Sequence, residues 1–326
     1  MTLKAPFWLA PLALCLLLAA LPGVVSPYVH DLIVKIVIYA IFALSLQLLV
    51  GFTGLVSFGH AAFFGIAAYI TVQAAPAAEQ AGLWWILPLA IGGAAAYALF
   101  VGLLSLRTKG VYFIMVTLAF AQMAFFVIHD TPLGGGSDGI FLNLRAVLTL
   151  GGVTLLDLDQ SRQLYWFCIT CLLFSWLLLA LLERSRFGHA LAGIRVNEQR
   201  MRAAGFNTYW YKLASFVIAA MLAGLAGFLM ATRNGAVNPE LLSWHQSGGV
   251  LLMIILGGLG SLPGAVLGAA AFILLQELFS NEALFGPAAQ VWQLWVGLSM
   301  IAFVAALPKG LIGLGRRQSA GGDPGH

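Results

Sequence analysis

Few of the residue patterns in this chain could carry out chemistry. Cys168 and Cys171 form a CxxC pair inside the apolar run WFCITCLLF, but no second cysteine pair or nearby histidine completes a metal site. The stretch GGGSDG at 134–139 resembles a phosphate-binding loop only in its glycines, because it lacks the lysine of that motif. No P-loop and no HExxH motif occur in the sequence. We therefore expect no catalytic residue, no metal site and no cofactor, and ATP hydrolysis would need another protein.

Ionisable residues inside the apolar runs are also few. Lys35 and Glu277 lie close to the ends of their runs, where long side chains can reach the membrane surface. A proton-coupled carrier is expected to bury at least one carboxylate or histidine near the middle of the membrane. The sequence offers no convincing candidate for such a group, which disfavours ion-coupled transport.

Two glycine-rich stretches break the apolar pattern, GFTGLVSFGHAAFFGIAAY at 51–69 and LGGLGSLPGAVLGAAAF at 256–272. In the first, Ser57 could cap a helix that has His60 in its first turn, and in the second Ser261 could cap the next helix. A helix start presents unpaired N–H groups, and two broken segments in comparable positions are a weak signature of a transporter with internal repeats. Alternatively, the small residues only allow close helix packing.

The elements that position these stretches are membrane-spanning helices. Of the 326 residues 61% are hydrophobic and 9% are charged, whereas about 25% of the residues in a soluble domain are charged. Runs of about 20 apolar residues match a hydrocarbon layer about 30 Å thick, and lipid forces backbone groups to pair within each segment. The predicted fold class is therefore all-α, a polytopic membrane protein of about ten transmembrane helices that include short or broken ones. The apolar runs fall at residues 7–25, 32–50, 60–75, 83–105, 110–129, 164–182, 213–232, 246–258, 262–280 and 289–307.

Two of these runs leave alternatives open. Residues 7–25 follow Lys4 and could be a cleavable signal, although an uncleaved first span fits the length of the run better. Residues 246–258 are shorter than a straight span requires, so they form a half helix, a re-entrant piece or a span completed by its polar flank.

The charge distribution predicts the orientation of the chain in the membrane. With a cytoplasmic N-terminus, twelve of the sixteen basic residues fall on inner segments, as the positive-inside rule requires. An even number of spans then places both termini in the cytoplasm. The long inner segment 183–212 carries six of these basic residues, whereas the outer segment 130–163 is net negative. Membrane topology thus accounts for the net charge of +4, and the charge gives no reason to expect nucleic-acid binding.

Three stretches of the chain resemble a known family: residues 51–69, quoted above, GIRVNEQRMRAAGFNTYWYKLASFVIAAMLAGLAG at 193–227, and PELLSWHQSGGVLLMIILGGLGSLPGAVLGA at 239–269. GGGSDGI at 134–140 adds a less specific match. Together they resemble the permease subunits of branched-chain amino acid ABC importers, of the LivM type. The resemblance implies a transmembrane permease domain over residues 1–315, with an inner coupling loop at 183–212 and an outer loop at 130–163, and a flexible cytoplasmic tail at 316–326.

The same resemblance implies a location and partners. The chain would be a multi-pass protein among the lipids of the bacterial inner membrane, would not be an enzyme, and would assemble with a LivH-like permease subunit, two cytoplasmic ABC ATPase subunits and a periplasmic substrate-binding protein. In such importers a short helix of the long inner loop docks on the ATPase and often carries an E-A-A…G pattern. Glu198, Ala203, Ala204 and Gly205 match that pattern imperfectly, because four residues separate the alanines from the glutamate. The residues implied for ATPase coupling are Arg195, Glu198, Arg200, Arg202, Ala203, Ala204 and Gly205.

Transport in this family would follow alternating access, in which motion of the ATPase switches the bundle between outward and inward states. An amphipathic amino acid needs mostly apolar walls with a few polar groups, and helix N-termini could meet its carboxylate. The residues predicted to line this pathway are Ser57, His60, Gly257, Gly258, Gly260 and Ser261. Helix capping and close packing are the alternative role for all six.

Other functions stay open on the sequence alone. An ion-coupled secondary carrier of small organic solutes would also be a bundle of about ten spans with broken helices, and a structural membrane subunit without a pathway is a third possibility. The substrate is open as well: leucine, isoleucine or valine, another amino acid, urea or an amide, or a small aromatic acid. The sequence does not say whether the chain pairs with a sister subunit or with itself.

Overall fold

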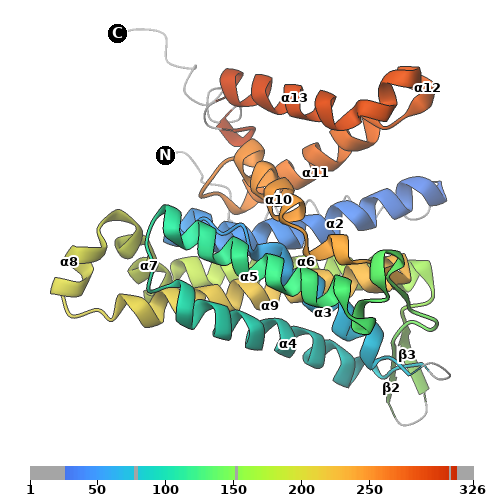
Figure 1. Cartoon of the computed structure of the whole chain (residues 1–326), viewed down its shortest axis with the longest axis horizontal. Helices are drawn as coiled ribbons and strands as arrows, with labels where there is room; N and C mark the ends of the chain where they lie inside the picture. Colours follow the sequence, from blue (N-terminus) through green and yellow to red (C-terminus); the bar gives the residue numbers. More distant parts are fainter. Residues whose placement is uncertain (1–25, 77–79, 151–152, 308–309, 314–326) are drawn as a thin grey trace, which may run out of the picture.

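The computed structural model describes residues 26–76, 80–150, 153–307 and 310–313. The predicted first span at 7–25 and the predicted tail at 316–326 lie outside the described residues. Within the described part the chain is built from helices, with four short strands (Figure 1). The prediction of an all-α polytopic membrane protein is confirmed, because seven helical segments are long and apolar enough to cross a membrane.

Nine of the predicted runs correspond to helices in the described residues. Six of the seven span-length segments are α2 with its π-helical extension η2, α4, α5, α6, α9 and α11, and the seventh combines α12, η6 and α13. Two apolar helices, α3 and α10, are shorter than a span. The bounds are α2 Pro27–Gln47, η2 Leu48–Thr53, α3 His60–Ala74, α4 Leu83–Ser105, α5 Val111–Asp130, α6 Ser161–Arg184, α9 Thr208–Asn234, α10 Trp244–Gly257, α11 Leu262–Phe279, α12 Glu282–Phe285, η6 Gly286–Val291 and α13 Trp292–Ala306.

The centre of the bundle is formed by α2 and α9, whose side chains are mostly buried. Helices α3 and α4 pack on α9, while α10 and α11 pack on α2. Helices α5 and α13 bury few of their side chains inside the structure, as expected for helices that face lipid or another subunit. Figure 1 shows α11, α12 and α13 diverging from the rest of the bundle.

Shorter elements cover the two ends of the bundle. At one end, the helices α7 Arg186–Val196 and α8 Glu198–Ala203 connect α6 to α9. At the other end the predicted outer loop folds into two 3-10 turns, η3 Pro132–Gly134 and η4 Gly136–Asp138, and a hairpin. In this hairpin β2 Val147–Leu150 pairs antiparallel with β3 Val153–Asp157. In addition β1 Ile140–Phe141 pairs antiparallel with β4 Ala236–Val237, and η5 Pro239–Leu242 leads into α10.

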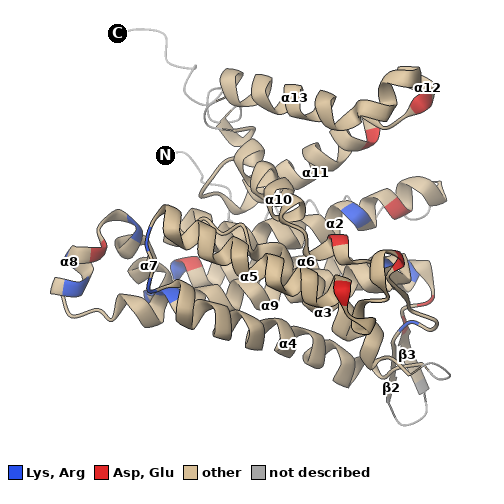
Figure 2. Cartoon of the chain, in the orientation of Figure 1, with Lys and Arg blue, Asp and Glu red and all other residues tan. Residues whose placement is uncertain are grey.

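Charges of opposite sign gather at these two ends (Figure 2). Helices α7 and α8 and the adjoining ends of α6 and α9 carry Arg184, Arg186, Arg195, Arg200, Arg202 and Lys212. Lys109, in the connection between α4 and α5, lines a pocket together with Arg195 and Lys212. Most of the described acidic residues lie on the segments at the opposite end, around the β2–β3 hairpin and η5. We call these the basic end and the acidic end. The separation of charge along the bundle supports a membrane orientation with the basic end inside.

Candidate functional site

The first glycine-broken stretch is a π-helical turn at the end of α2. The helix widens over Leu48–Thr53 and stops at Gly54, whose backbone N–H bonds to the carbonyl of Leu49. Gly54 has a φ of 73°, a left-handed conformation that glycine adopts without strain. The sequence prediction that the apolar run is broken in this stretch is therefore confirmed.

The start of α3 differs from its prediction. The N-cap is Gly59, and Ser57 accepts a hydrogen bond from the Gly59 N–H at 3.3 Å, so Ser57 is not the helix cap. In the first turn of α3, the backbone N–H of Ala61 donates a hydrogen bond to the hydroxyl of Ser247 in α10 at 2.9 Å. A serine that is 186 positions further along the chain thus satisfies the donor. Local sequence could not reveal this contact, because it exists only once α3 and α10 are packed together.

His60 lies in the interior of the bundle. Its side chain is fully buried, its Nε2 is 2.8 Å from the hydroxyl of Ser45, and its ring stacks on Phe42 with 5.6 Å between ring centroids. Its Nδ1 has no hydrogen-bond partner among the described residues. Ser57 is buried as well. The structure therefore places both predicted pathway residues in a packed core. His60 is also a buried histidine of the kind for which the sequence offered no convincing candidate.

The second glycine-broken stretch connects α10 to α11. Ser261 is the N-cap of α11 and accepts a hydrogen bond from the Gly264 N–H at 3.3 Å, which confirms the predicted cap. The two helices cross so closely that a Cβ added to Gly257 would come within 1.8 Å of the Gly264 carbonyl oxygen. Glycine is therefore required at this crossing.

The two broken stretches are joined by Gln47 in the last turn of α2. This side chain is fully buried. With its amide oriented to match its neighbours, its oxygen accepts hydrogen bonds from the N–H groups of Gly260, at 2.5 Å, and Ser261, at 2.6 Å. A Cβ added to Gly51 would lie 3.2 Å from the Cα of Gly260. The turn after α2 and the turn before α11 therefore form one packed unit, which we call the double turn (residues 47–54 and 257–261).

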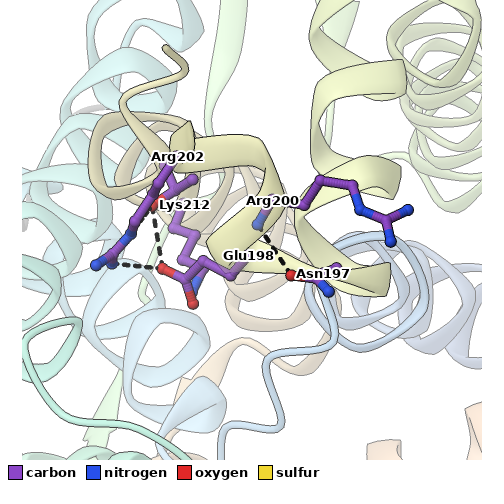
Figure 3. A network of polar contacts seen from close by, with 6 residues as sticks. Asn197, Glu198, Arg200, Arg202 and Lys212 are labelled. Atoms are coloured by element: carbon purple, nitrogen blue, oxygen red, sulfur yellow. Dashed lines mark hydrogen bonds and ion pairs between the residues drawn. The ribbon is translucent and has the colours of Figure 1, made fainter. Parts of the chain in front are cut away.

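The predicted coupling residues form a compact unit at the basic end. Asn197 caps α8 by accepting a hydrogen bond from the Arg200 N–H at 2.9 Å (Figure 3). The helix ends in a Schellman motif, in which the N–H groups of Gly205 and Phe206 bond to the carbonyls of Arg202 and Met201. Gly205 has a φ of 90°, a left-handed conformation that glycine adopts without strain at the end of a helix.

Glu198 holds α8 against α9. Its carboxylate accepts hydrogen bonds from Arg202 and Lys212, each at 2.6 Å, and from the Thr208 hydroxyl at 3.0 Å (Figure 3). Partial burial alone would raise the pKa of this carboxyl, but the hydrogen bond and charge of Lys212, together with Thr208 and Arg202, outweigh it and lower the pKa from 4.5 to about 2. Glu198 therefore acts within the chain, as an anchor for α8.

The other coupling residues divide into an inward and an outward group. Arg195, in the last turn of α7, donates a hydrogen bond to the carbonyl of Gly51 in the double turn. Arg200 points away from the Glu198 network (Figure 3), and Ala203, Ala204 and Gly205 are exposed. The neighbouring Val196 leaves 84% of its surface exposed although it is apolar. Glu198 is thus engaged within the chain, whereas Arg195 is exposed and at the same time bonded to the double turn.

A cavity of about 670 Å³ lies among α2, α5, η5, α10, α11 and α13, toward the acidic end. Its polar lining includes Tyr39, Gln122, Glu240, His245, Gln246 and Gln276. Its apolar walls include Phe125, Met253, Phe272 and Ile273. None of the six predicted pathway residues lines it, although all six are in the described part of the chain. The signal that could have revealed it is the recurrence of glutamine within apolar runs.

A second cavity, of about 360 Å³, lies at the basic end. It is lined by the turn after α2, including Thr53 and Gly54, and by the charged residues Lys109, Arg195, Glu198 and Lys212. The two cavities thus approach the bundle from its two opposite ends, and the double turn lies beside the second of them.

A bundle of span-length helices that contains two broken segments, with a polar-lined cavity toward each end, is the architecture of a polytopic membrane transport protein. The family model of the branched-chain amino acid transport system permease component matches residues 28–305. The chain belongs to this family.

Curated relatives agree with this assignment. The chain is 30% identical over 325 residues to the high-affinity branched-chain amino acid transport system permease protein LivM of Escherichia coli K12, a match that covers 94% of the chain and 75% of the relative. LivH of the same strain is 24% identical over 254 residues, which cover 74% of the chain and 82% of the relative. The xylose transport system permease protein XylH of that strain is 30% identical over 131 residues, covering 39% of the chain and 33% of the relative. No solved structure matches the chain.

Proposed function

We propose that this permease subunit carries branched-chain or chemically related amino acids inward across the bacterial inner membrane, driven by ATP that a separate subunit hydrolyses. The family match over residues 28–305, together with the LivM and LivH relatives, carries the proposal. The partners that we propose are a LivH-like permease subunit, two cytoplasmic ABC ATPase subunits and a periplasmic binding protein.

The cavity at the acidic end supports an amino acid as the substrate. A volume of about 670 Å³ falls in the range of small-molecule sites. Glu240 can attract an ammonium group, and His245 and Gln246 in the first turn of α10 offer donors for a carboxylate. Phe125 and Phe272 provide an apolar surface for an aliphatic side chain. We propose this cavity as the outer part of the translocation pathway.

The proposed inner part of the pathway retains the residues indicated by the sequence. Gly257, Gly258, Gly260 and Ser261 form the turn beside the basic-end cavity, and Ser57 and His60 lie in the core. For the substrate to pass, the helices around these residues would have to separate in the inward state. Alternating access requires such a rearrangement.

The proposed ATPase contact is the exposed surface formed by the last turn of α7 and by α8. It combines an apolar side chain, Val196, with Arg200 and the small residues Ala203 and Ala204. Glu198 and the Schellman motif hold this short helix in shape without the partner. A preformed helix loses less conformational entropy on docking than a disordered loop would. The basic end would accordingly face the cytoplasm.

The test is uptake into proteoliposomes. Vesicles with the complete complex should accumulate leucine under one condition only. ATP must be present on the side of the membrane that carries the ATPase subunits, and the binding protein must be present on the opposite side. A substrate panel of leucine, glutamine, urea and benzoate would separate the substrate classes. Accumulation driven by a proton or sodium gradient, by the permease without ATPase, would contradict the proposal and establish the carrier alternative.

Ala204→Glu tests the coupling surface. Ala204 is exposed at the end of α8, so the variant should insert and fold normally. Added volume and negative charge at a docking face should lower ATP-driven uptake strongly. Normal uptake and normal association with the ATPase would remove this surface from the mechanism.

A further inference from the structure

The carbonyl of Gly51 lies in the last turn of the π-helical segment η2. Carbonyls in the last turn of a helix lack N–H donors within the helix and must find donors elsewhere. The donor for Gly51 is Nη1 of Arg195, from a helix 144 positions further along the chain. A side chain of the inner loop thus completes the end of a helix in the centre of the bundle.

Arg195 also contacts both halves of the double turn. A Cβ added to Gly54 would lie 3.3 Å from the Cγ of Arg195, and a Cβ added to Gly260 would lie 3.8 Å from its Nη1. Gln47 ties the same two halves to each other. The guanidinium group therefore sits where the two broken segments meet, and α7 itself packs against η2.

No acidic side chain among the described residues forms an ion pair with Arg195. The nearest carboxylate in the sequence, that of Glu198, is bound to Arg202 and Lys212. The guanidinium carries several donors in a rigid plane. It is therefore suited to hold a backbone carbonyl while the helix that carries it moves.

We propose that Arg195 is a positioning residue that transmits motion of the α7–α8 segment to the double turn. The proposal rests on the proposed function, since the motion would come from the ATPase. When α8 is displaced, α7 moves with it, and Arg195 pulls the Gly51 carbonyl and displaces the Gly260 turn. Both broken segments then respond together, because Gln47 links them. In this arrangement Arg195 contacts the double turn, and the docking surface consists of Val196 and the outward residues of α8.

The experiment compares Arg195→Gln with Arg195→Lys in the complete complex in proteoliposomes. Three quantities are measured for each variant: the amount of ATPase subunit that co-purifies, the rate of ATP hydrolysis, and the number of substrate molecules taken up per ATP. Arg186→Gln is the matched control, because Arg186 lies exposed in the first turn of the same helix. A melting curve confirms that each variant is folded.

We expect Arg195→Gln to keep the ATPase bound and hydrolysing while uptake per ATP falls about tenfold or more, the scale of losing one hydrogen bond to a charged donor. Uptake per ATP should fall less in Arg195→Lys, which keeps the charge, and should equal the wild-type value in Arg186→Gln. Uptake is normalised to assembled complex, so a change in stability alone leaves the ratio unchanged.

Two results would overturn the inference. Loss of the ATPase from the Arg195→Gln complex would make Arg195 a docking residue, and an unchanged ratio of uptake to ATP hydrolysis would remove it from transmission. Both results leave the proposed function intact. Failure of the wild-type complex to couple uptake to ATP would instead contradict the proposed function.

Discussion

Replacing Glu198 with glutamine tests the interpretation of the basic end most directly. The substitution keeps the size of the side chain but removes the charge that three neighbouring groups bind. A tenfold change in proton affinity corresponds to about 1.4 kcal/mol, so lowering the pKa of Glu198 from 4.5 to about 2 sets an upper limit of about 3 kcal/mol. Arg202 leaves 52% of its side chain exposed, so solvent screens part of this interaction. We expect a loss of about 1–2 kcal/mol in the free energy of opening α8.

The pH dependence has a defined sign. The carboxyl has a lower pKa in the folded segment than in an unfolded chain, so its contribution is complete above about pH 4.5 and is lost as the pH falls toward 2. Hydrogen exchange of the backbone amides of residues 199–206, expressed as protection factors, measures both effects. At pH 7 the protection factors in Glu198→Gln should be roughly 5–30-fold lower than in the wild type.

Glu183→Gln is the control for this experiment. Glu183 lies in the last turn of α6 at the same end of the bundle and has no described ion-pair partner. Its substitution should leave the protection of α8 unchanged. Equal protection of α8 in the wild type and in Glu198→Gln at pH 7 would refute the role of Glu198 as an anchor.

Four further predictions concern the bundle. Gly54→Leu should destabilise the protein by about 1–2 kcal/mol or more, and Gly54→Asn by less, because φ is positive there and asparagine tolerates this conformation; equal melting temperatures would contradict this. Ser247→Ala should lower the free energy of unfolding by about 1–3 kcal/mol, because it leaves the Ala61 N–H unpaired. Ser247→Thr, which keeps the hydroxyl, should show no such loss in a denaturation curve. His60→Ala should lower the melting temperature because the ring is fully buried, and normal uptake per folded complex would remove His60 from the pathway. A membrane-impermeant thiol reagent applied from outside should label Ser137→Cys and not Asn197→Cys, and the reverse pattern would invert the orientation.

The helices could be predicted from the sequence because hydrophobicity alone determines which segments enter a bilayer. The run at 246–258 was predicted to be short, and α10 has 14 residues. The breaks at Gly54 and at Gly258 to Gly260 were also predictable, since glycine favours positive φ and all three positions adopt it. These features depend on each segment's own composition.

Long-range contacts could not be predicted in the same way. The cap of α3 was assigned to Ser57, the nearest serine, but the structure uses Ser247. The sequence groups Arg195 with Arg200, yet Arg195 bonds to the Gly51 carbonyl whereas the Arg200 side chain points away from the Glu198 network (Figure 3). Gln47 carries no motif, and only its position opposite Gly260 and Ser261 shows what it binds. Each of these roles depends on which helices become neighbours.

The hydrogen bond between Ser247 and Ala61 has a consequence for biosynthesis. The donor at the start of α3 leaves the ribosome 186 residues before its acceptor. At about 5–20 residues per second, this separation is roughly 10–40 s of translation. During that interval α3 can be in the membrane, but the first turn of the helix has to rely on water or on the insertion machinery for a partner. The first turn of α3 thus gains its partner only when α10 has been made. A ribosome stalled before residue 247 would leave a nascent chain in which the Ala61 N–H still lacks the Ser247 hydroxyl.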